Sequence, residues 1–179
     1  MPSLDLLLEL RHLKRVPRAG WLRVGATHVE SVADHSWGVA WLVLVLLPED
    51  LDRERALAYA VLHDVAEVRT GDITPYDGVS ADEKKRRESL AMEGLLGQSV
   101  PALQDMWREY ALQADEESRF VRQLDRLELA LEALALAEEG EPGMEQFLIS
   151  AEEYVTDPRL RTYLVEIRHR MESIGRGRA

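Results

Sequence analysis

Residues 58–68 read AYAVLHDVAEV, a run of apolar and small residues that is interrupted by the pair His63-Asp64. A second histidine, His35, lies upstream in SVADHSWGVA, and an aspartate, Asp125, lies downstream in FVRQLDRLELAL. All three segments have the apolar spacing of a helix that faces a core. Burying an ionisable side chain without a partner costs several kcal/mol. We therefore expect these four side chains to share one buried divalent metal ion.

The hydrophobic periodicity and the capping residues predict an all-α protein, a single-domain bundle of about seven to eight helices. Ser31, with Asp34 three residues later, predicts a capping box at the start of the helix that carries His35. The next helix is expected to continue through His63 to Glu67, which would share a face because they are four residues apart. No segment alternates as a strand would. The expected helices span approximately residues 4–13, 31–47, 53–68, 82–97, 101–113, 116–139, 144–155 and 158–173, followed by a frayed tail, GRGRA, at 175–179.

The length of 179 residues and the hydrophobic content of 46% suit one domain with a sizeable core. We expect a single domain over residues 1–179, with a metal-site core at approximately 28–130 and C-terminal helices at 142–174 that pack on it. The chain has no cysteine, which excludes a thiolate zinc site, a disulfide framework and a cysteine nucleophile. The chemistry must therefore use oxygen and nitrogen ligands.

The formal net charge of −11 argues against a nucleic-acid polymer as partner, because binding a phosphate backbone needs a basic surface. A small anionic substrate remains compatible with this charge if a few arginines lie at the site. The longest apolar run, Val39 to Leu47, is well below the ~20 residues that span a bilayer. The N-terminal MPSLDLLLEL carries acids where a signal peptide is basic. We expect a soluble, cytoplasmic protein with no membrane partner.

Two imidazoles and two carboxylates suit Co, Mn, Zn, Fe or Ni better than Mg, which prefers nearly all oxygen ligands. A set of four protein ligands leaves open positions on such an ion for water and substrate. An ion in this state lowers the pKa of a bound water and polarises a phosphoryl oxygen. The ligand set therefore favours a hydrolase that depends on one divalent metal ion, whose identity the sequence leaves open.

The order His35, His63-Asp64 and Asp125 on helical segments resembles the HD-domain phosphohydrolases, whose pattern is H...HD...D. The resemblance extends to the 5'-deoxynucleotidase branch of that superfamily through five further stretches of the chain. It implies an HD-type helical bundle and a homodimer. It also implies a metal-dependent phosphatase that converts 2'-deoxyribonucleoside 5'-monophosphates to deoxynucleoside and phosphate. The stretches are KRVPRAGW, ESVADHSWGVA, LHDVAEVRTGDITP, EKKRRES and FVRQLDRLE, within residues 14–130.

By the same resemblance, Glu67 of HDVAE and Asp72 of GDITP match the acidic residues that the branch uses around the scissile phosphate. Either carboxyl group can orient the attacking water or protonate the leaving 5'-oxygen. The sequence does not divide these two catalytic roles between them.

The substrate-binding residues implied by the resemblance are Trp21 and Arg18. Trp21 matches an aromatic residue that contacts the nucleoside; alternatively, its ring anchors a loop in the core. In the branch an arginine directly precedes this tryptophan to hold the phosphate, whereas Ala19 and Gly20 intervene here. We select Arg18 for that role, with Arg15 and Arg23 as rivals, and the basic run at 84–87 either assists or faces solvent.

Two other functions share this ligand set. One is an HD-type phosphatase or pyrophosphatase of another small phosphorylated metabolite. The other is a non-catalytic module that senses nucleotides without hydrolysing them, which the presence of both Glu67 and Asp72 disfavours. A dinuclear oxygenase-like member would need further histidine ligands, and His12, His28 and His169 match no such role.

Overall fold

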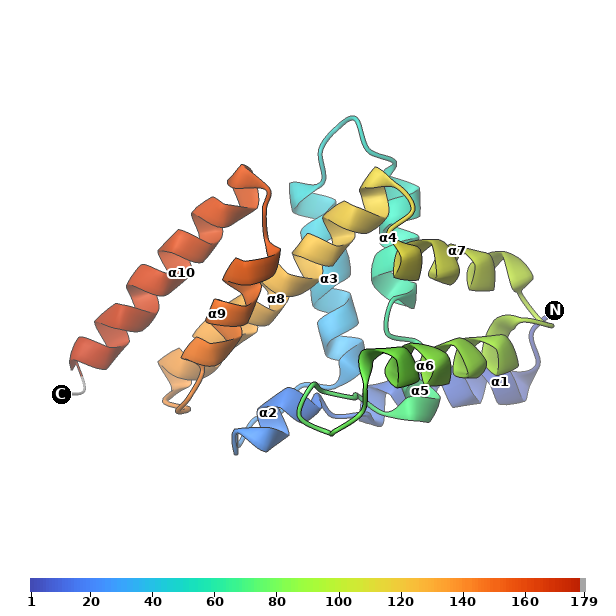
Figure 1. The fold of residues 1–179 in the computed structure, drawn as a ribbon, viewed down its shortest axis with the longest axis horizontal. Coiled ribbons are helices and arrows are strands. Elements are labelled where there is room, and N and C mark those ends of the chain that lie inside the picture. Colours follow the sequence, from blue (N-terminus) through green and yellow to red (C-terminus); the bar gives the residue numbers. More distant parts are fainter. Residues whose placement is uncertain (178–179) are drawn as a thin grey trace.

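The computed structural model describes residues 1–177 and is built of helices (Figure 1). The predicted all-α fold is confirmed, since the only extended pairing in these residues is an isolated bridge between Pro17 and Ser31. No helix in the described part of the chain is long and apolar enough to cross a membrane. The elements are α1 (Leu4–Leu10), the 3-10 helix η1 (Arg11–Arg15), α2 (Ala19–Arg23), α3 (Val32–Leu46), α4 (Arg53–Leu62), α5 (Glu67–Thr70), α6 (Ala81–Leu96), α7 (Pro101–Leu112), α8 (Glu116–Glu139), α9 (Glu145–Tyr154) and α10 (Pro158–Gly177).

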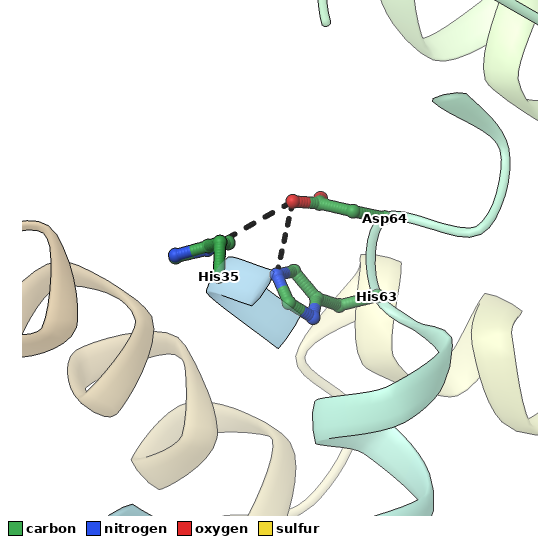
Figure 2. A group of neighbouring side chains, drawn as sticks. All are labelled: His35, His63 and Asp64. Atoms are coloured by element: carbon green, nitrogen blue, oxygen red, sulfur yellow. Dashed lines mark ion pairs between the residues drawn. The ribbon is translucent and has the colours of Figure 1, made fainter. Parts of the chain in front are cut away.

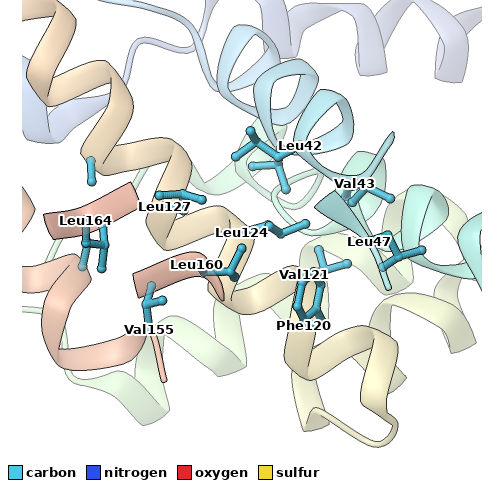
Figure 3. Packing of buried hydrophobic residues seen from close by; sticks show 14 of the residues in the cluster. Leu42, Val43, Leu47, Phe120, Val121, Leu124, Leu127, Val155, Leu160 and Leu164 are labelled. Carbon is cyan, nitrogen blue, oxygen red and sulfur yellow. The ribbon is translucent and has the colours of Figure 1, made fainter. Parts of the chain in front are cut away.

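Helices α3, α4 and α8 meet at the centre of the molecule and share the largest buried cluster. Helix α8 contacts α3 and α4, and it also contacts α9 and α10, which lie beside it in Figure 1. Figure 3 shows Leu124 of α8 between Val43 of α3 and Leu160 of α10, with Leu127 farther along α8, and all four are almost fully buried. Because such interiors are close-packed, these contacts fix the relative positions of the helices.

Two smaller buried clusters extend this core. One joins α1, α6 and α7 through Leu6, Met92 and Trp107. The other packs Trp21 of α2 against Leu129 of α8 and Phe147 of α9. The short helix α2 is therefore anchored to the core through Trp21.

Side-chain caps determine where α3 and α8 begin. The Ser31 hydroxyl accepts the amide hydrogen of Asp34, and the Asp34 carboxylate accepts that of Ser31, which completes the predicted capping box. Asp115 and Ser118 form an equivalent box at the start of α8. These caps set the register of the two helices that carry His35 and Asp125.

The expected continuous helix over 53–68 is wrong, because α4 ends at Leu62 and α5 begins only at Glu67. Nδ1–H of His63 donates to the Ala60 carbonyl at 2.8 Å, and a continuous α-helix would offer this carbonyl to the amide of residue 64. The chain then tightens into i to i−3 hydrogen bonds, such as Glu67 N–H to Asp64 O at 2.9 Å. His63-Asp64 therefore lies in a turn, and the argument from a shared helical face does not apply.

Two other boundaries differ from the expectation. The segment between the expected helices 4–13 and 31–47 contains α2, and Arg18, the N-cap residue of α2, therefore has a defined position. At the other end of the chain, α10 continues to Gly177 and includes the first three residues, 175–177, of the segment that was expected to fray. Residues 178–179 of that segment lie outside the described residues.

Truncation of the central core should destabilise the protein more than truncation at its edge. We expect Leu124→Ala to lower the free energy of unfolding by about 2–5 kcal/mol, because Leu124 has no exposed surface and a cavity remains. Leu131→Ala, on the same helix but 37% exposed, is the control and should cost less than about 1 kcal/mol. Chemical denaturation measures both, and equal losses would contradict this account of the core.

Candidate metal centre and substrate pocket

The four predicted metal ligands come from three parts of the fold. His35 lies in the first turn of α3, His63 and Asp64 in the turn after α4, and Asp125 in α8. Figure 2 shows the Asp64 carboxylate between the two imidazoles, with its Oδ2 atom 3.0 Å from His63 Nε2 and 3.9 Å from His35 Nε2. His35 Nε2 also lies 3.1 Å from Asp125 Oδ1. The structure therefore brings all four side chains together.

The donor atoms at this centre fit a divalent metal ion. Both Nδ1 atoms have acceptors, the Ala60 carbonyl for His63 and the Glu128 carboxylate for His35, which directs both Nε2 atoms to the cluster. His63 Nε2 is buried and has no hydrogen-bond partner. Nitrogen and oxygen donors from His35, His63 and Asp64 all lie within 4.8 Å of one another. A cation that accepts these lone pairs would satisfy the unpaired nitrogen.

The charges around the centre keep its carboxyl groups ionised. Burial alone would raise the pKa of Asp64, but His63, His35 and Arg18 lower it well below its usual range. Burial opposes ionisation of Asp125 too, yet its hydrogen bond with His35 and its neighbour Arg126 hold its pKa low. Both aspartates therefore offer charged oxygen ligands.

His35 is also held by Glu128, a residue that the sequence analysis did not identify. Its Nδ1–H donates to Glu128 Oε2 at 2.5 Å, and the side chain of Glu128 packs closely over Gly38, one turn after His35 on α3. Burial and the charge of Arg18 lower the pKa of His35, but its hydrogen bonds with Asp125 and Glu128 outweigh them and raise it to about 10. A bound metal would therefore replace a proton on Nε2. The sequence does indicate that Glu128 lies near the site, because it follows Asp125 by three residues and so lies on the same side of α8.

Arg18 lies closest to the metal ligands among the three arginines considered for the phosphate. Its Nη1 atom is 3.7 Å from Asp64 Oδ2 and 3.9 Å from Asp72 Oδ2. Asp72 also accepts the amide hydrogen of Ala19 at 2.7 Å, which ties the loop after α5 to the start of α2. Of the rivals, Arg15 is exposed in η1. Arg23 lines the same pocket, but its guanidinium stacks over the Tyr76 ring, 3.8 Å from the centroid.

Glu67 is a buried acid with one free oxygen. It is only 3% exposed, its Oε2 atom has no hydrogen-bond partner, and its Oε1 atom is 3.9 Å from Lys84 Nζ. Burial, followed by repulsion from Asp64 and Asp72, raises its pKa well above the usual value. Burial and these negative neighbours therefore favour the protonated form of Glu67.

Trp21 satisfies both descriptions that the sequence left open. Its ring is 1% exposed and packs on Phe147 at a centroid distance of 4.2 Å, as a core anchor does. Its Nε1–H donates to Glu30 at 3.0 Å, and the residue also lines the pocket that three of the candidate ligands, His63, Asp64 and Asp125, line. Trp21 is thus a rigid wall of that pocket.

The pocket beside the centre has a volume of about 650 Å³, within the range typical of small-molecule sites. His63, Asp64, Glu67, Asp72 and Asp125 line it. Basic side chains line it as well, although the chain as a whole is strongly acidic. Of the basic run at 84–87, the two lysines line the pocket, and the two arginines pair with Glu83 instead. The basic lining residues are Arg18, Arg23, Lys84, Lys85, Arg122 and Arg126.

Known proteins share both the sequence and the fold. The bovine protein named 5'-deoxynucleotidase HDDC2 is 40% identical over 146 residues, which cover 78% of this chain and 71% of the bovine one. A conserved hypothetical protein from Pyrococcus furiosus is 30% identical, with a TM-score of 0.79 over 93% of this chain and 99% of its own. The HD phosphohydrolase DatZ of cyanophage S-2L, solved with dA and one catalytic Zn²⁺ ion, has a similar fold, with a TM-score of 0.59 at 20% identity over 97% of this chain and 98% of its own.

The family model described as HD domain matches residues 10–161, which include all four candidate ligands. The family resemblance drawn from the H...HD...D pattern is therefore confirmed. On this match, and on the identity with relatives over most of its length, the chain belongs to the HD domain family.

Proposed function

We propose that the protein is a 5'-deoxynucleotidase, a metal-dependent phosphomonoesterase that hydrolyses 2'-deoxyribonucleoside 5'-monophosphates to deoxynucleoside and phosphate. The observation that carries this proposal is that Arg18 and Glu67 line one pocket together with His63, Asp64 and Asp125, directly beside the buried His35. The name of the bovine relative, a 5'-deoxynucleotidase at 40% identity, supports the substrate class. The basic lining of the pocket in an acidic chain favours a small anionic substrate.

His35, His63, Asp64 and Asp125 are the proposed ligands of one divalent cation. When bound, such a cation lowers the pKa of a coordinated water and polarises a phosphoryl oxygen. The mixed nitrogen and oxygen donors favour Co, Mn, Zn, Fe or Ni over Mg. The cyanophage HD phosphohydrolase, which was solved with one catalytic Zn²⁺ ion, supports a single-ion site.

The protein's own side chains divide the remaining work. Arg18, whose guanidinium lies beside Asp64, binds the phosphate through two oxygens. Glu67 holds a proton on its buried carboxyl group and delivers it to the leaving 5'-oxygen. Asp72 accepts the Ala19 amide hydrogen and lies 3.9 Å from Arg18, so it positions α2 and the guanidinium.

Trp21 is the proposed wall against which the nucleoside packs. Glu30 holds its indole nitrogen and Phe147 supports its ring, so the wall does not move aside for a larger sugar. A rigid aromatic surface at the ribose position can exclude a 2'-hydroxyl. This arrangement supports selection of deoxyribonucleotides.

We also propose that the protein is a homodimer and acts as one domain over residues 1–179. Helix α3 exposes a row of large apolar side chains, with Trp37 70% and Trp41 52% exposed and their rings stacked at 6.3 Å. Leu44 and Val45 continue the exposed apolar surface toward the end of the helix. Apolar surface of this kind is typical of a protein interface. The cytoplasmic location expected from the sequence stays a prediction.

Substrate specificity is tested with protein that has been stripped of metal and resupplied separately with Co, Mn, Zn or Mg. We expect phosphate release to depend on the metal and to be confined to deoxyribonucleoside 5'-monophosphates. Ribonucleotides, 3'-monophosphates and sugar phosphates are the comparison panel. Turnover of a sugar phosphate alone would indicate another metabolite as substrate. Stoichiometric metal without any turnover would indicate a sensing module.

The proton-donor role of Glu67 is tested by Glu67→Gln, which keeps the shape of the side chain and removes the proton. We expect kcat to fall by about 100-fold or more, because general acid catalysis contributes that much. The metal content should stay the same, since Glu67 is not a proposed ligand. Glu93→Gln, on the exposed side of α6, is the control. A loss of less than about threefold for Glu67→Gln would reject this role.

The proposed dimer is tested by Trp41→Glu, which places a charge in the exposed apolar row of α3. We expect the native protein to have the mass of a dimer in light scattering and the variant to shift to the mass of a monomer. Tyr163→Glu on α10, where the side chain is 42% exposed, serves as the control. A native mass equal to one chain would contradict the proposal.

A further inference from the structure

The buried polar atoms without partners are concentrated in one place. Within residues 1–177, four buried side-chain nitrogen or oxygen atoms have no hydrogen-bond partner, and all four belong to residues that line the pocket at the metal centre. Proteins satisfy the great majority of such groups, because each one left unpaired costs about 1–3 kcal/mol. The atoms are His63 Nε2, Glu67 Oε2, Tyr110 Oη and Arg126 Nε.

The function proposed above gives a role to two of these atoms, and a nearby carboxylate compensates the third. His63 Nε2 faces the metal and Glu67 Oε2 carries the proton for the leaving group. Arg126 Nε lies 3.8 Å from Asp125 Oδ2, so a carboxylate compensates its charge. The hydroxyl of Tyr110 remains, and the proposed function gives it no role.

Tyr110 lies directly beside the metal ligands. It comes from α7, is 3% exposed, and its ring meets the His63 ring edge to face at a centroid distance of 5.8 Å. Arg122, one turn before Asp125 on α8, lies close to the Tyr110 hydroxyl but not in hydrogen-bonding geometry. A tyrosine hydroxyl is a hydrogen-bond donor, so it can donate to an anionic oxygen bound in the pocket.

We propose that Tyr110 and Arg122 form a second phosphate-binding subsite, in which the Tyr110 hydroxyl donates a hydrogen bond to a phosphate oxygen of the substrate. Tyr110 lines the same pocket as His63, Asp64 and Asp125, and its ring contacts that of His63, so a phosphate bound in this pocket would lie near it. The cation beside it favours an anionic oxygen over a neutral nucleoside group. Arg18 reaches the phosphate from α2, whereas this subsite belongs to α7 and α8. The inference rests on the phosphatase function proposed above.

The structure provides an internal control in Tyr59, whose ring lies 5.8 Å from that of Tyr110. The Tyr59 hydroxyl is bonded to Asp115 at 2.6 Å, and the residue does not line the pocket. The two tyrosines therefore differ in what their hydroxyls do. A structural hydroxyl contributes to stability, while a ligand-binding hydroxyl contributes to affinity or rate.

The test compares Tyr110→Phe with Tyr59→Phe, each of which removes one oxygen atom. For Tyr110→Phe we expect kcat/KM for deoxyribonucleoside 5'-monophosphates to fall about 10- to 100-fold, because a hydrogen bond to a charged group is lost. Its unfolding midpoint should stay constant or rise, since an unpaired hydroxyl is removed, and its metal content should not change. For Tyr59→Phe we expect the reverse, a lower midpoint with unchanged kcat/KM. A Tyr110→Phe variant with activity within twofold of the native protein would overturn the proposal.

Binding of inorganic phosphate to the metal-loaded protein separates this inference from the proposed function. Isothermal titration calorimetry needs no turnover, so it remains decisive if no deoxyribonucleotide is hydrolysed. We expect Tyr110→Phe and Arg122→Gln each to weaken phosphate binding at least about fivefold, consistent with the loss of one charged contact. Equal affinity in the native and variant proteins, or no phosphate binding by the native protein, would overturn the subsite.

Discussion

The burial of ionisable groups where α3, α4 and α8 meet is the constraint on which the site depends. His35 has no exposed surface and Asp125 is 8% exposed, and the two come from helices that bury leucines and valines elsewhere along their length. Such groups are stable only when opposite charges or hydrogen bonds reach each of them. The loop before α2 supplies Arg18, α8 supplies Glu128, and a metal ion would satisfy the remaining lone pair on His63.

The break between α4 and α5 allows two consecutive residues, His63 and Asp64, to point toward the same candidate metal site. On a continuous helix, consecutive side chains point about 100° apart. In the observed turn, His63 Nε2 and Asp64 Oδ2 are only 3.0 Å apart. The hydrogen bond from the His63 ring to Ala60 both accompanies the end of the helix and fixes the tautomer. A single local interaction therefore orients the imidazole and redirects the chain toward Glu67.

Local charge at the pocket differs from the charge of the whole chain. The net charge of −11 argues against a polymeric polyanion as partner, while basic side chains around the pocket suit a single phosphate group. Lys84 has a defined position at the pocket, because its ammonium group donates to the Ile73 carbonyl at 2.8 Å and lies 3.9 Å from Glu67 Oε1. Arg86 and Arg87, from the same run, pair with Glu83 and do not line the pocket.

The sequence alone determined the all-α class, most helix boundaries and the order of His35, His63-Asp64 and Asp125, because periodicity and caps act over a few residues. It did not determine that the chain turns at His63, or that Glu128 holds His35. Nor did it show that the Tyr110 hydroxyl is left unpaired beside the metal ligands. The turn at His63 depends on a local hydrogen bond from its ring to Ala60, which apolar periodicity does not reveal. The other two features were decided by tertiary structure, because they join segments tens of residues apart that only the packing of helices brings together.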